Sequence, residues 1–481
     1  MSAPALPDVP TTLLIGGSWR PAAGGATFPV DNPATGQALI EVADAGVPDA
    51  LDAIRAAADA QQALAALSPA QRAALLRRVE AALRDRTDEI ALLITLEMGK
   101  PIAESRGEVG YAADFFGWFA DEALRIGGDY RLAPTGLTRI LVQHKAVGPC
   151  LLITPWNFPL AMGARKIAPA IAAGCPSVLK PAEQTPLTSL LLARIIEESG
   201  APPGAVNVLT TSRPAEAVGA VIDSGLARKL SFTGSTEVGK LLLARCAAQV
   251  MRTSMELGGN APFIVCADAD LDEAVEGALL AKMRNIGQAC TAANRFIVAE
   301  SLAGEFTSRL AKRMGALTVA AGWLDGSQVG PLIDDAAVEK FDRLVRDALD
   351  RGATVETGAV PAIGRFVTPT VLSGVAPGTA LLDEEIFGPL APITTFRAEE
   401  EAVRAANGTP YGLVSYVYTR DLRRALRLVG SLATGMVGVN SGVVSNAAAP
   451  FGGVKQSGLG REGGFEGIAE YLDTTYAAIP V

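Results

Sequence analysis

The chain carries two kinds of hydrophobic pattern, and they meet near Ala146. Over residues 49–127 the apolar residues repeat at helical spacing, as in DALDAIRAAADAQQALAAL, so this stretch is predicted to be helical. One helix is expected to begin at Ser68, because serine can cap it, Pro69 suits its first position and Gln71 completes a capping box. The opening section is therefore a set of helices.

Beyond Ala146, short apolar runs bounded by Gly and Pro alternate with helix-length segments. The runs are GPCLLITPW, CPSVLKP, AVNVLT and ARKLSFTG, and TSLLLARIIEESG is one of the segments between them. Apolar strands joined by helices are typical of a parallel sheet covered on both faces. A second series starts near Ala261 with APFIVCADAD and NRFIVAE, passes a polar helix at 335–351 and reaches TGMVGVN near Met436. We therefore expect two α/β domains.

Residues 129–144, DYRLAPTGLTRILVQH, follow a different pattern. Polar and apolar residues alternate on both sides of a Pro-Thr-Gly turn, which predicts a hairpin. The terminal EYLDTTYAAIPV is also strand-like and is the expected partner of this hairpin. Exposed strands of this kind often pair across subunits, so we expect a homo-oligomer, either a dimer or a tetramer.

Composition and charge exclude several classes of protein. With 481 residues the chain should hold two or three domains, and its 42 Lys and Arg against 51 Asp and Glu give a net charge of −9 without a basic patch for nucleic acid. The five cysteines form no CxxC pair and His144 is the single histidine, so we expect free thiols, no metal site and no Ser-His-Asp triad. No signal peptide and no run of about 18 apolar residues is visible, which indicates a soluble, cytoplasmic protein without a membrane partner.

Two segments could bind a nucleotide. FTGSTEVG at 232–239 is a strand end, a glycine turn and a helix start, where free N–H groups and the helix dipole favour a phosphate. It matches neither GxGxxG nor a Walker loop, and a capped connection is the alternative. Lys180 ends the strand in VLKPAEQTP, at the edge where α/β sheets bind ligands, and Glu183 could accept hydrogen bonds from a ribose diol. Taken alone, this segment is better explained as a solvated Lys/Glu pair in a loop.

Three further residues could perform covalent chemistry. Cys290, in NIGQACTAANR, lies in a loop of small and polar residues, whereas Cys150 and Cys266 lie in apolar runs typical of structural cysteines. Glu256, in SMELGGN, could act as a base. Asn157, in ITPWNFP, could donate to an oxyanion. Taken alone, the glutamate and the asparagine are better explained as turn residues.

The motifs TPWNFP, VLKPAEQTP, FTGSTEVG, MELGGNAPFIV, GQACTAANR, EEIFGPL and PFGGVKQSGLGRE occur in one order along the chain. From about Leu14 to its C-terminus the chain thereby resembles the aldehyde dehydrogenase superfamily, and within it the succinate-semialdehyde dehydrogenases. The resemblance implies an α/β fold with a Rossmann-type cofactor domain, an α/β catalytic domain and a small β oligomerisation extension. The corresponding ranges are 1–126 and 146–257 for NAD binding, 258–466 for catalysis, and 127–145 and 467–481 for oligomerisation.

The resemblance also implies a covalent mechanism. Cys290 matches the nucleophile that forms a thiohemiacetal, Asn157 the group that holds its oxyanion, and Glu256 the base that activates water to hydrolyse the thioester. The expected cofactor is NAD rather than NADP, because a carboxylate at Glu183 would bond the ribose hydroxyls and repel a 2′-phosphate. The implied cofactor-binding residues are Ile153, Thr154, Pro155, Trp156, Lys180, Glu183, Gly219, Phe232, Gly234, Ser235, Leu257, Glu385 and Phe387.

Arg165, Arg284 and Ser445 match the positions at which succinate-semialdehyde dehydrogenases hold the far carboxylate of the substrate. Two guanidiniums in one pocket suit an anionic tail, and an uncharged substrate would leave both charges unpaired. Succinate semialdehyde is therefore the expected substrate. Glutarate semialdehyde or 2-oxoglutarate semialdehyde is the alternative, because residues 446–449 are less charged than in close relatives and leave the pocket width open.

Two other functions are less well supported by the motifs. A coenzyme-A-acylating dehydrogenase would not need the base Glu256, and a non-catalytic binding protein of this fold would not need Cys290, Glu256 and Asn157 together. Several relatives carry a second cysteine two residues after the nucleophile, where this chain has Ala292. We therefore expect no disulfide switch within this loop.

Overall fold

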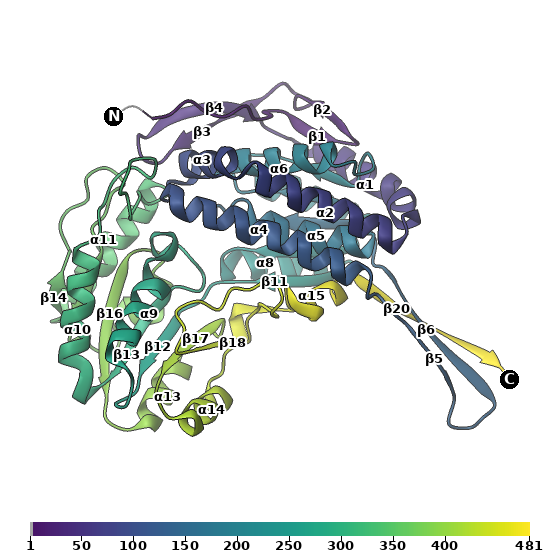
Figure 1. The fold of residues 1–481 in the computed structure, drawn as a ribbon. Helices are drawn as coiled ribbons and strands as arrows, with labels where there is room; N and C mark the ends of the chain where they lie inside the picture. The colour runs from purple at the N-terminus through teal and green to yellow at the C-terminus, as the bar shows by residue number, and fades with distance from the viewer. Residues whose placement is uncertain (1–2) are drawn as a thin grey trace.

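The computed structural model describes residues 3–481, which form two large sheets with helices packed on them (Figure 1). This architecture confirms the predicted α/β class. The first sheet has the order β19 (Gly458–Leu459), β11 (Arg252–Glu256), β10 (Lys229–Thr233), β7 (Cys150–Ile153), β8 (Ser177–Lys180), β9 (Val206–Val208), β1 (Leu13–Ile15), β2 (Ser18–Arg20). The second has the order β14 (Thr354–Thr357), β15 (Thr370–Ser373), β16 (Leu390–Phe396), β13 (Ala293–Ala299), β12 (Ala261–Val265), β17 (Val414–Tyr418), β18 (Met436–Val439).

The centre of the first sheet is parallel and buried on both faces. Strands β11, β10, β7, β8 and β9 are parallel, whereas β1 and β19 join the ends of this series antiparallel. Along β7, Cys150 and Leu152 enter the apolar core on one face, and Leu151 and Ile153 enter the core on the other. This alternation explains why the strand is an unbroken apolar run in the sequence.

One strand of the first sheet comes from late in the chain. β19 pairs with β11, although residues 458–459 lie within the range predicted for the catalytic domain. A segment beyond the second sheet therefore returns to the first. The other domain boundaries stay predictions.

Helices cover both faces of the first sheet. The capping box expected at Ser68 is confirmed: its Oγ accepts from the Gln71 N–H at 3.2 Å, and Gln71 Oε1 accepts from the Ser68 N–H at 2.8 Å. The helices of this part are α1 (Val47–Ala66), α2 (Pro69–Asp85), α3 (Thr87–Met98), α4 (Ile102–Ala123), α5 (Ala161–Ala173), α6 (Pro186–Glu198), α7 (Pro214–Asp223), α8 (Thr236–Ala247) and α15 (Gly464–Ala469).

A buried carboxylate fixes the start of α5, the helix that follows β7. Glu108 on α4 accepts hydrogen bonds from the N–H groups of Leu160 and Ala161 at 2.9 and 3.1 Å. Lys100 donates to the other carboxylate oxygen at 2.6 Å. An acidic group at a helix N-terminus is favoured by the free N–H groups and by the helix dipole. Glu108 therefore sets where α5 begins.

The second sheet repeats the same layered construction. Its strands are parallel except for β14, which pairs antiparallel with β15. Phe263 and Val265 of β12 enter one apolar core, and Ile264 enters the other. The helical segments around it are α9 (Leu271–Met283), α10 (Glu300–Gly315), α11 (Asp335–Asp350), α12 (Ala380–Asp383), α13 (Glu399–Asn407), α14 (Leu422–Ser431) and the 3-10 turns η1 (Arg284–Gly287) and η2 (Lys455–Ser457).

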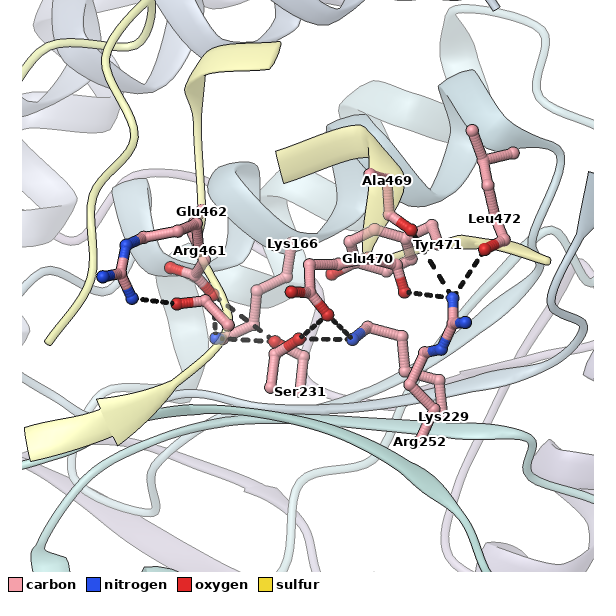
Figure 2. A network of polar contacts seen from close by, with 12 residues as sticks. Lys166, Lys229, Ser231, Arg252, Arg461, Glu462, Ala469, Glu470, Tyr471 and Leu472 are labelled. Atoms are coloured by element: carbon pink, nitrogen blue, oxygen red, sulfur yellow. Dashed lines mark hydrogen bonds and ion pairs between the residues drawn. The ribbon is translucent and has the colours of Figure 1, made fainter. Parts of the chain in front are cut away.

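A three-stranded arm extends away from the two sheets (Figure 1). It consists of β5 (Asp129–Leu132), β6 (Thr138–Ala146) and β20 (Leu472–Pro480). The predicted hairpin and its pairing with the C-terminal strand are thereby confirmed. Arg252 on β11 donates to the carbonyl of Leu472 at 2.6 Å, which joins the base of the arm to the first sheet (Figure 2).

The strands that precede α1 were not predicted from the sequence. β1 and β2 form a hairpin over Gly16 and Gly17, which both adopt positive φ, and β3 (Thr27–Asn32) pairs with β4 (Gln37–Ala43). Strands of three residues are too short to show a period of two. None of the helices within residues 3–481 combines the length and the hydrophobicity needed to cross a bilayer.

Candidate active site

A cavity of about 860 Å³ opens at the carboxyl ends of β7, β8, β10 and β11. This is the edge at which parallel α/β sheets bind ligands. Loops that precede β13 and β16 in the second sheet complete its wall. Of the predicted site residues, the cavity lining includes Asn157, Glu256, Cys290, Ile153, Thr154, Pro155, Trp156, Lys180, Glu183, Gly219, Phe232, Gly234, Ser235, Leu257, Glu385 and Phe387.

Cys290 lies between η1 and β13, in the loop expected from the sequence, and it is partly exposed. Burial raises the pKa of its thiol to about 12, and the nearby Arg165 guanidinium opposes this rise only in part. The thiol is therefore protonated at neutral pH in this state. A loop position does not by itself produce a thiolate, so the nucleophile depends on a base or on a change of its surroundings.

Hydrogen bonds at the side-chain amide and at the backbone carbonyl hold Asn157 in place. Its Nδ2 donates to the carbonyl of Gln288 at 3.0 Å. Its own carbonyl accepts from Lys100 Nζ at 2.7 Å and from Asn285 Nδ2 at 3.0 Å. A side-chain amide has two N–H groups, so one remains to donate to a negative oxygen in the cavity.

Glu256 is the last residue of β11 and is buried. Within residues 3–481 neither of its carboxylate oxygens has a hydrogen-bond partner. Burial and the charge of Glu462 raise the pKa of Glu256 well above its ordinary value, whereas Arg165 and Lys166 oppose this shift. An unpaired carboxylate with a raised pKa is suited to take a proton from water.

Beside Glu256 lies a buried ion cluster that the sequence did not indicate. Arg165 and Lys166 on α5 both bond Glu462, Arg165 through Nε at 2.7 Å. Figure 2 shows Lys166 beside Glu462 and Ser231, to which it also donates at 3.0 Å. Although burial opposes its ionisation, the two cations lower the pKa of Glu462 to about 2. The carboxylate is therefore charged at neutral pH. Glu462 lies 296 positions after Lys166 and 297 after Arg165, so no local sequence pattern reveals these contacts.

The turn before the nucleophile is strained. Asn285, Ile286 and Gly287 all adopt positive φ, at 57°, 63° and 73°, and a β-branched residue such as isoleucine rarely does so. Glu104 on α4 accepts a hydrogen bond from the Asn285 N–H, and the Asn285 side chain donates to the Gln288 carbonyl at 2.8 Å. These bonds keep the turn, and hence the Cys290 loop, in one conformation.

The outer part of the cavity has features that suit a dinucleotide. Lys180 Nζ lies 3.2 Å from Glu183 Oε2. Ser235 caps α8 by accepting from the Val238 N–H at 3.3 Å, so the N-terminus of this helix faces the cavity wall. A Cβ at Gly234 would lie 2.4 Å from the Phe232 ring, which explains why only glycine fits this turn.

Glu385 and Phe387 lie on the opposite wall. Glu385 accepts from the Gly259 N–H at 3.1 Å, and Lys340 donates to its carbonyl at 2.6 Å. Burial raises the pKa of Glu385 to about 7, while the Gly259 N–H opposes this rise. The Phe387 backbone has a φ of 56°, and its ring meets Trp156 edge to face at 5.4 Å. Both rings therefore have fixed positions in the wall.

The three residues expected at the substrate carboxylate do not line the main cavity. The structure brings two of them together, because Arg284 Nη1 donates to Ser445 Oγ at 3.1 Å. The expectation that an uncharged substrate would leave both guanidiniums unpaired is wrong for Arg165. Its guanidinium already has an ion-pair partner, because both Nε and Nη2 donate to the Glu462 carboxylate.

Known proteins resemble this chain over nearly its whole length. Residues 19–477 match the aldehyde dehydrogenase family. A succinate-semialdehyde dehydrogenase of Paenarthrobacter nicotinovorans is 55% identical to this chain, and the match covers 92% of this chain and 98% of that protein. A glutarate-semialdehyde dehydrogenase of Pseudomonas putida is 46% identical, and the match covers 97% of each of the two chains. The crystal structure of an E. coli NADP-dependent enzyme superposes with a TM-score of 0.97 at 45% identity over 98% of both chains.

Proposed function

This chain belongs to the aldehyde dehydrogenase family, and from that premise we propose that it oxidises a carboxylate-bearing semialdehyde with NAD, succinate semialdehyde being the best candidate. The observation that carries the proposal is that Cys290, Glu256 and Asn157 line one cavity. A nucleophile, a base and an amide donor are the groups that oxidation through a thioester requires.

The residues of the outer cavity fit a nicotinamide dinucleotide. The N-terminus of α8 with Gly234 and Ser235 would take the pyrophosphate, since no side chain there obstructs a close approach. Lys180 and Glu183 would take the adenosine ribose, and Glu385 the nicotinamide ribose. When bound, the nicotinamide supplies the acceptor for the hydride that leaves the substrate.

The protein residues would act in two stages. In the first, Cys290 would release its proton to water in the open cavity, and its sulfur would bond to the aldehyde carbon, which converts the carbonyl oxygen to an oxyanion. The free Asn157 N–H and the Cys290 backbone N–H would stabilise that oxyanion. Loss of hydride from the same carbon restores the carbonyl and leaves a thioester on Cys290.

In the second stage the thioester is hydrolysed. Glu256 would take a proton from a water molecule, whose oxygen bonds to the thioester carbon as the carbon–sulfur bond breaks. The products are the carboxylic acid and the free Cys290 thiol. The raised pKa of Glu256 supports this role, because the ionised carboxylate is then a stronger base than a solvated glutamate.

Glu183 supports NAD over NADP. Its carboxylate lies beside Lys180 and, if the adenosine ribose binds there, would repel a 2′-phosphate. Because the superposed E. coli enzyme is described as NADP-dependent, the family fold does not fix this choice. The preference therefore depends on this side chain.

The semialdehyde substrate is supported by Arg284, which has no ion-pair partner within residues 3–481 but bonds Ser445. An unpaired guanidinium near the nucleophile favours an anionic substrate group. Glutarate semialdehyde is the second candidate, because a relative of that name is 46% identical. Release of a free acid, rather than its coenzyme A thioester, would follow from the presence of Glu256.

The test is Arg284→Ala. With succinate semialdehyde we expect kcat/KM to fall about 100-fold, because a desolvated charge pair is lost, and with butanal it should change less than about twofold. Glutarate semialdehyde in the same assay ranks the two substrates. The exposed Arg106, paired with Asp88, provides the matched control Arg106→Ala. An equal fall with both aldehydes would contradict the carboxylate-binding role.

We further infer that the arm pairs with a second copy of the chain, since its strands β5 and β20 are exposed along their length. The oligomer would be a dimer or tetramer.

A further inference from the structure

The Arg284–Ser445 pair lies in a second polar cluster that is separate from the main cavity lining. The Arg284 guanidinium carbon lies 5.1 Å from the centre of the Phe158 ring and 5.8 Å from that of Tyr111. Phe158 also lines the cavity that contains Cys290. The cluster is therefore adjacent to the reacting end of that cavity, and two aromatic rings hold its guanidinium in place.

Tyr111 lies on α4, and its ring is fixed by an edge-to-face contact with Phe115 at 4.9 Å. Its phenol oxygen is completely buried, yet it has no hydrogen-bond partner within residues 3–481. A buried hydroxyl without a partner is costly, and native proteins rarely keep one without a reason. Within residues 3–481 it therefore has no nearby acceptor other than the neighbouring Ser445 hydroxyl.

The surroundings of the phenol favour an anion as that acceptor. Burial raises the pKa of Tyr111, while Arg165, Arg284 and the Ser445 hydroxyl oppose the rise, so all three lie near it. At neutral pH the phenol keeps its proton and is a donor. Ser445 accepts from Arg284, so its own proton is also free to donate.

The nearby carboxylates already have partners. Glu462 is bonded by Arg165 and Lys166. Glu104, which also lies near Arg284, accepts the Asn285 N–H. Among the described residues, the positive charge of Arg284 and the two hydroxyl donors are thus left without a negative partner.

We propose that Tyr111 is a specificity-determining residue whose phenol donates a hydrogen bond to the far carboxylate of the substrate. With Arg284 and Ser445 it completes a set of three donors around one anionic group. This inference rests on the proposed function, because it names a further contact to the same substrate class. It predicts that selectivity for a charged aldehyde depends on a single hydroxyl of α4.

The experiment compares Tyr111→Phe with the parent enzyme on succinate semialdehyde and on butanal. Phenylalanine keeps the ring contacts with Phe115 and Arg284 and removes only the hydroxyl, and a thermal melt checks that the fold is retained. We expect kcat/KM for succinate semialdehyde to fall about 10- to 100-fold, as for a lost hydrogen bond to a charged group, while that for butanal stays within about twofold. The inhibition constant of succinate should rise by a similar factor.

Ser308→Ala is the control, because it removes an exposed hydroxyl on α10, outside the cavity and the arm, and neither rate should change. If Tyr111→Phe keeps the parent preference for succinate semialdehyde over butanal and the parent succinate inhibition, the proposal is overturned while the proposed function stands. If the parent enzyme itself shows no preference for the charged aldehyde, the proposed function fails first.

Discussion

The two ends of the cavity are built on different physical principles. Behind the reacting end, Arg165 and Lys166 are almost fully buried and share the single carboxylate of Glu462. At the outer end, Lys180 pairs with Glu183, whose side chain is 43% exposed to solvent. Water screens a charge at the outer end but not at the reacting end. Substitutions at the reacting end should therefore affect folding and catalysis together, whereas those at the outer end should affect cofactor choice alone.

The largest effect on stability is expected for Glu462→Gln. The substitution leaves Arg165 and Lys166 buried without a carboxylate, which should lower the free energy of unfolding by about 3–5 kcal/mol. Urea denaturation at pH 7 measures it. Glu300→Gln removes the partner of Arg397 at the exposed surface and should leave the free energy of unfolding nearly unchanged. Equal costs for the two variants would remove the distinction between the two environments.

The same variant has a defined dependence on pH. The pKa of Glu462 is lowered from an ordinary value of 4.5 to about 2, so its contribution to stability is complete above the ordinary value and is lost as the pH falls toward the lowered one. The stability difference between parent and Glu462→Gln should therefore shrink between these pH values. A difference that grows on acidification would contradict the ion cluster.

A smaller effect, confined to cofactor choice, is expected for Glu183→Ser. Loss of the carboxylate removes the repulsion of a 2′-phosphate and the hydrogen bonds to the ribose, so the ratio of kcat/KM for NADP to that for NAD should rise about 10- to 100-fold. Initial rates at limiting cofactor measure this ratio. Stability should stay within about 0.5 kcal/mol of the parent. Glu198→Ser, a substitution at an exposed position of α6, is the control and should leave the ratio unchanged. An unchanged ratio in Glu183→Ser would contradict the role of Glu183 in cofactor choice.

The outer end of the cavity could be predicted from the sequence because each of its parts is local. A strand end followed by Lys180, and a strand end followed by Gly234 and Ser235, are visible within a few residues. Parallel strands then bring these ends to one edge of the sheet. At the reacting end, Cys290 could be distinguished from the other cysteines because its loop consists of small and polar residues.

The buried ion cluster behind the reacting end could not be predicted in this way. Lys166 and Glu462 are charged residues that a single sequence assigns to the surface, and only the folded chain shows them buried against each other. The same limit explains the incorrect expectation for Arg165, whose partner lies 297 residues away. The short strands β1 and β2 were missing from the pattern because three residues carry no periodicity.

The central claim is that oxidation proceeds through an acyl group on Cys290 that Glu256 later removes. Intact-mass and peptide-mapping spectrometry of Glu256→Gln, mixed with NAD and succinate semialdehyde, tests it most directly. The account predicts a succinyl thioester that accumulates on the peptide containing Cys290, and no adduct when Cys290→Ala is added to the same protein. Turnover by the Cys290→Ala protein at the parent rate, or an acyl group on any other residue, would contradict it.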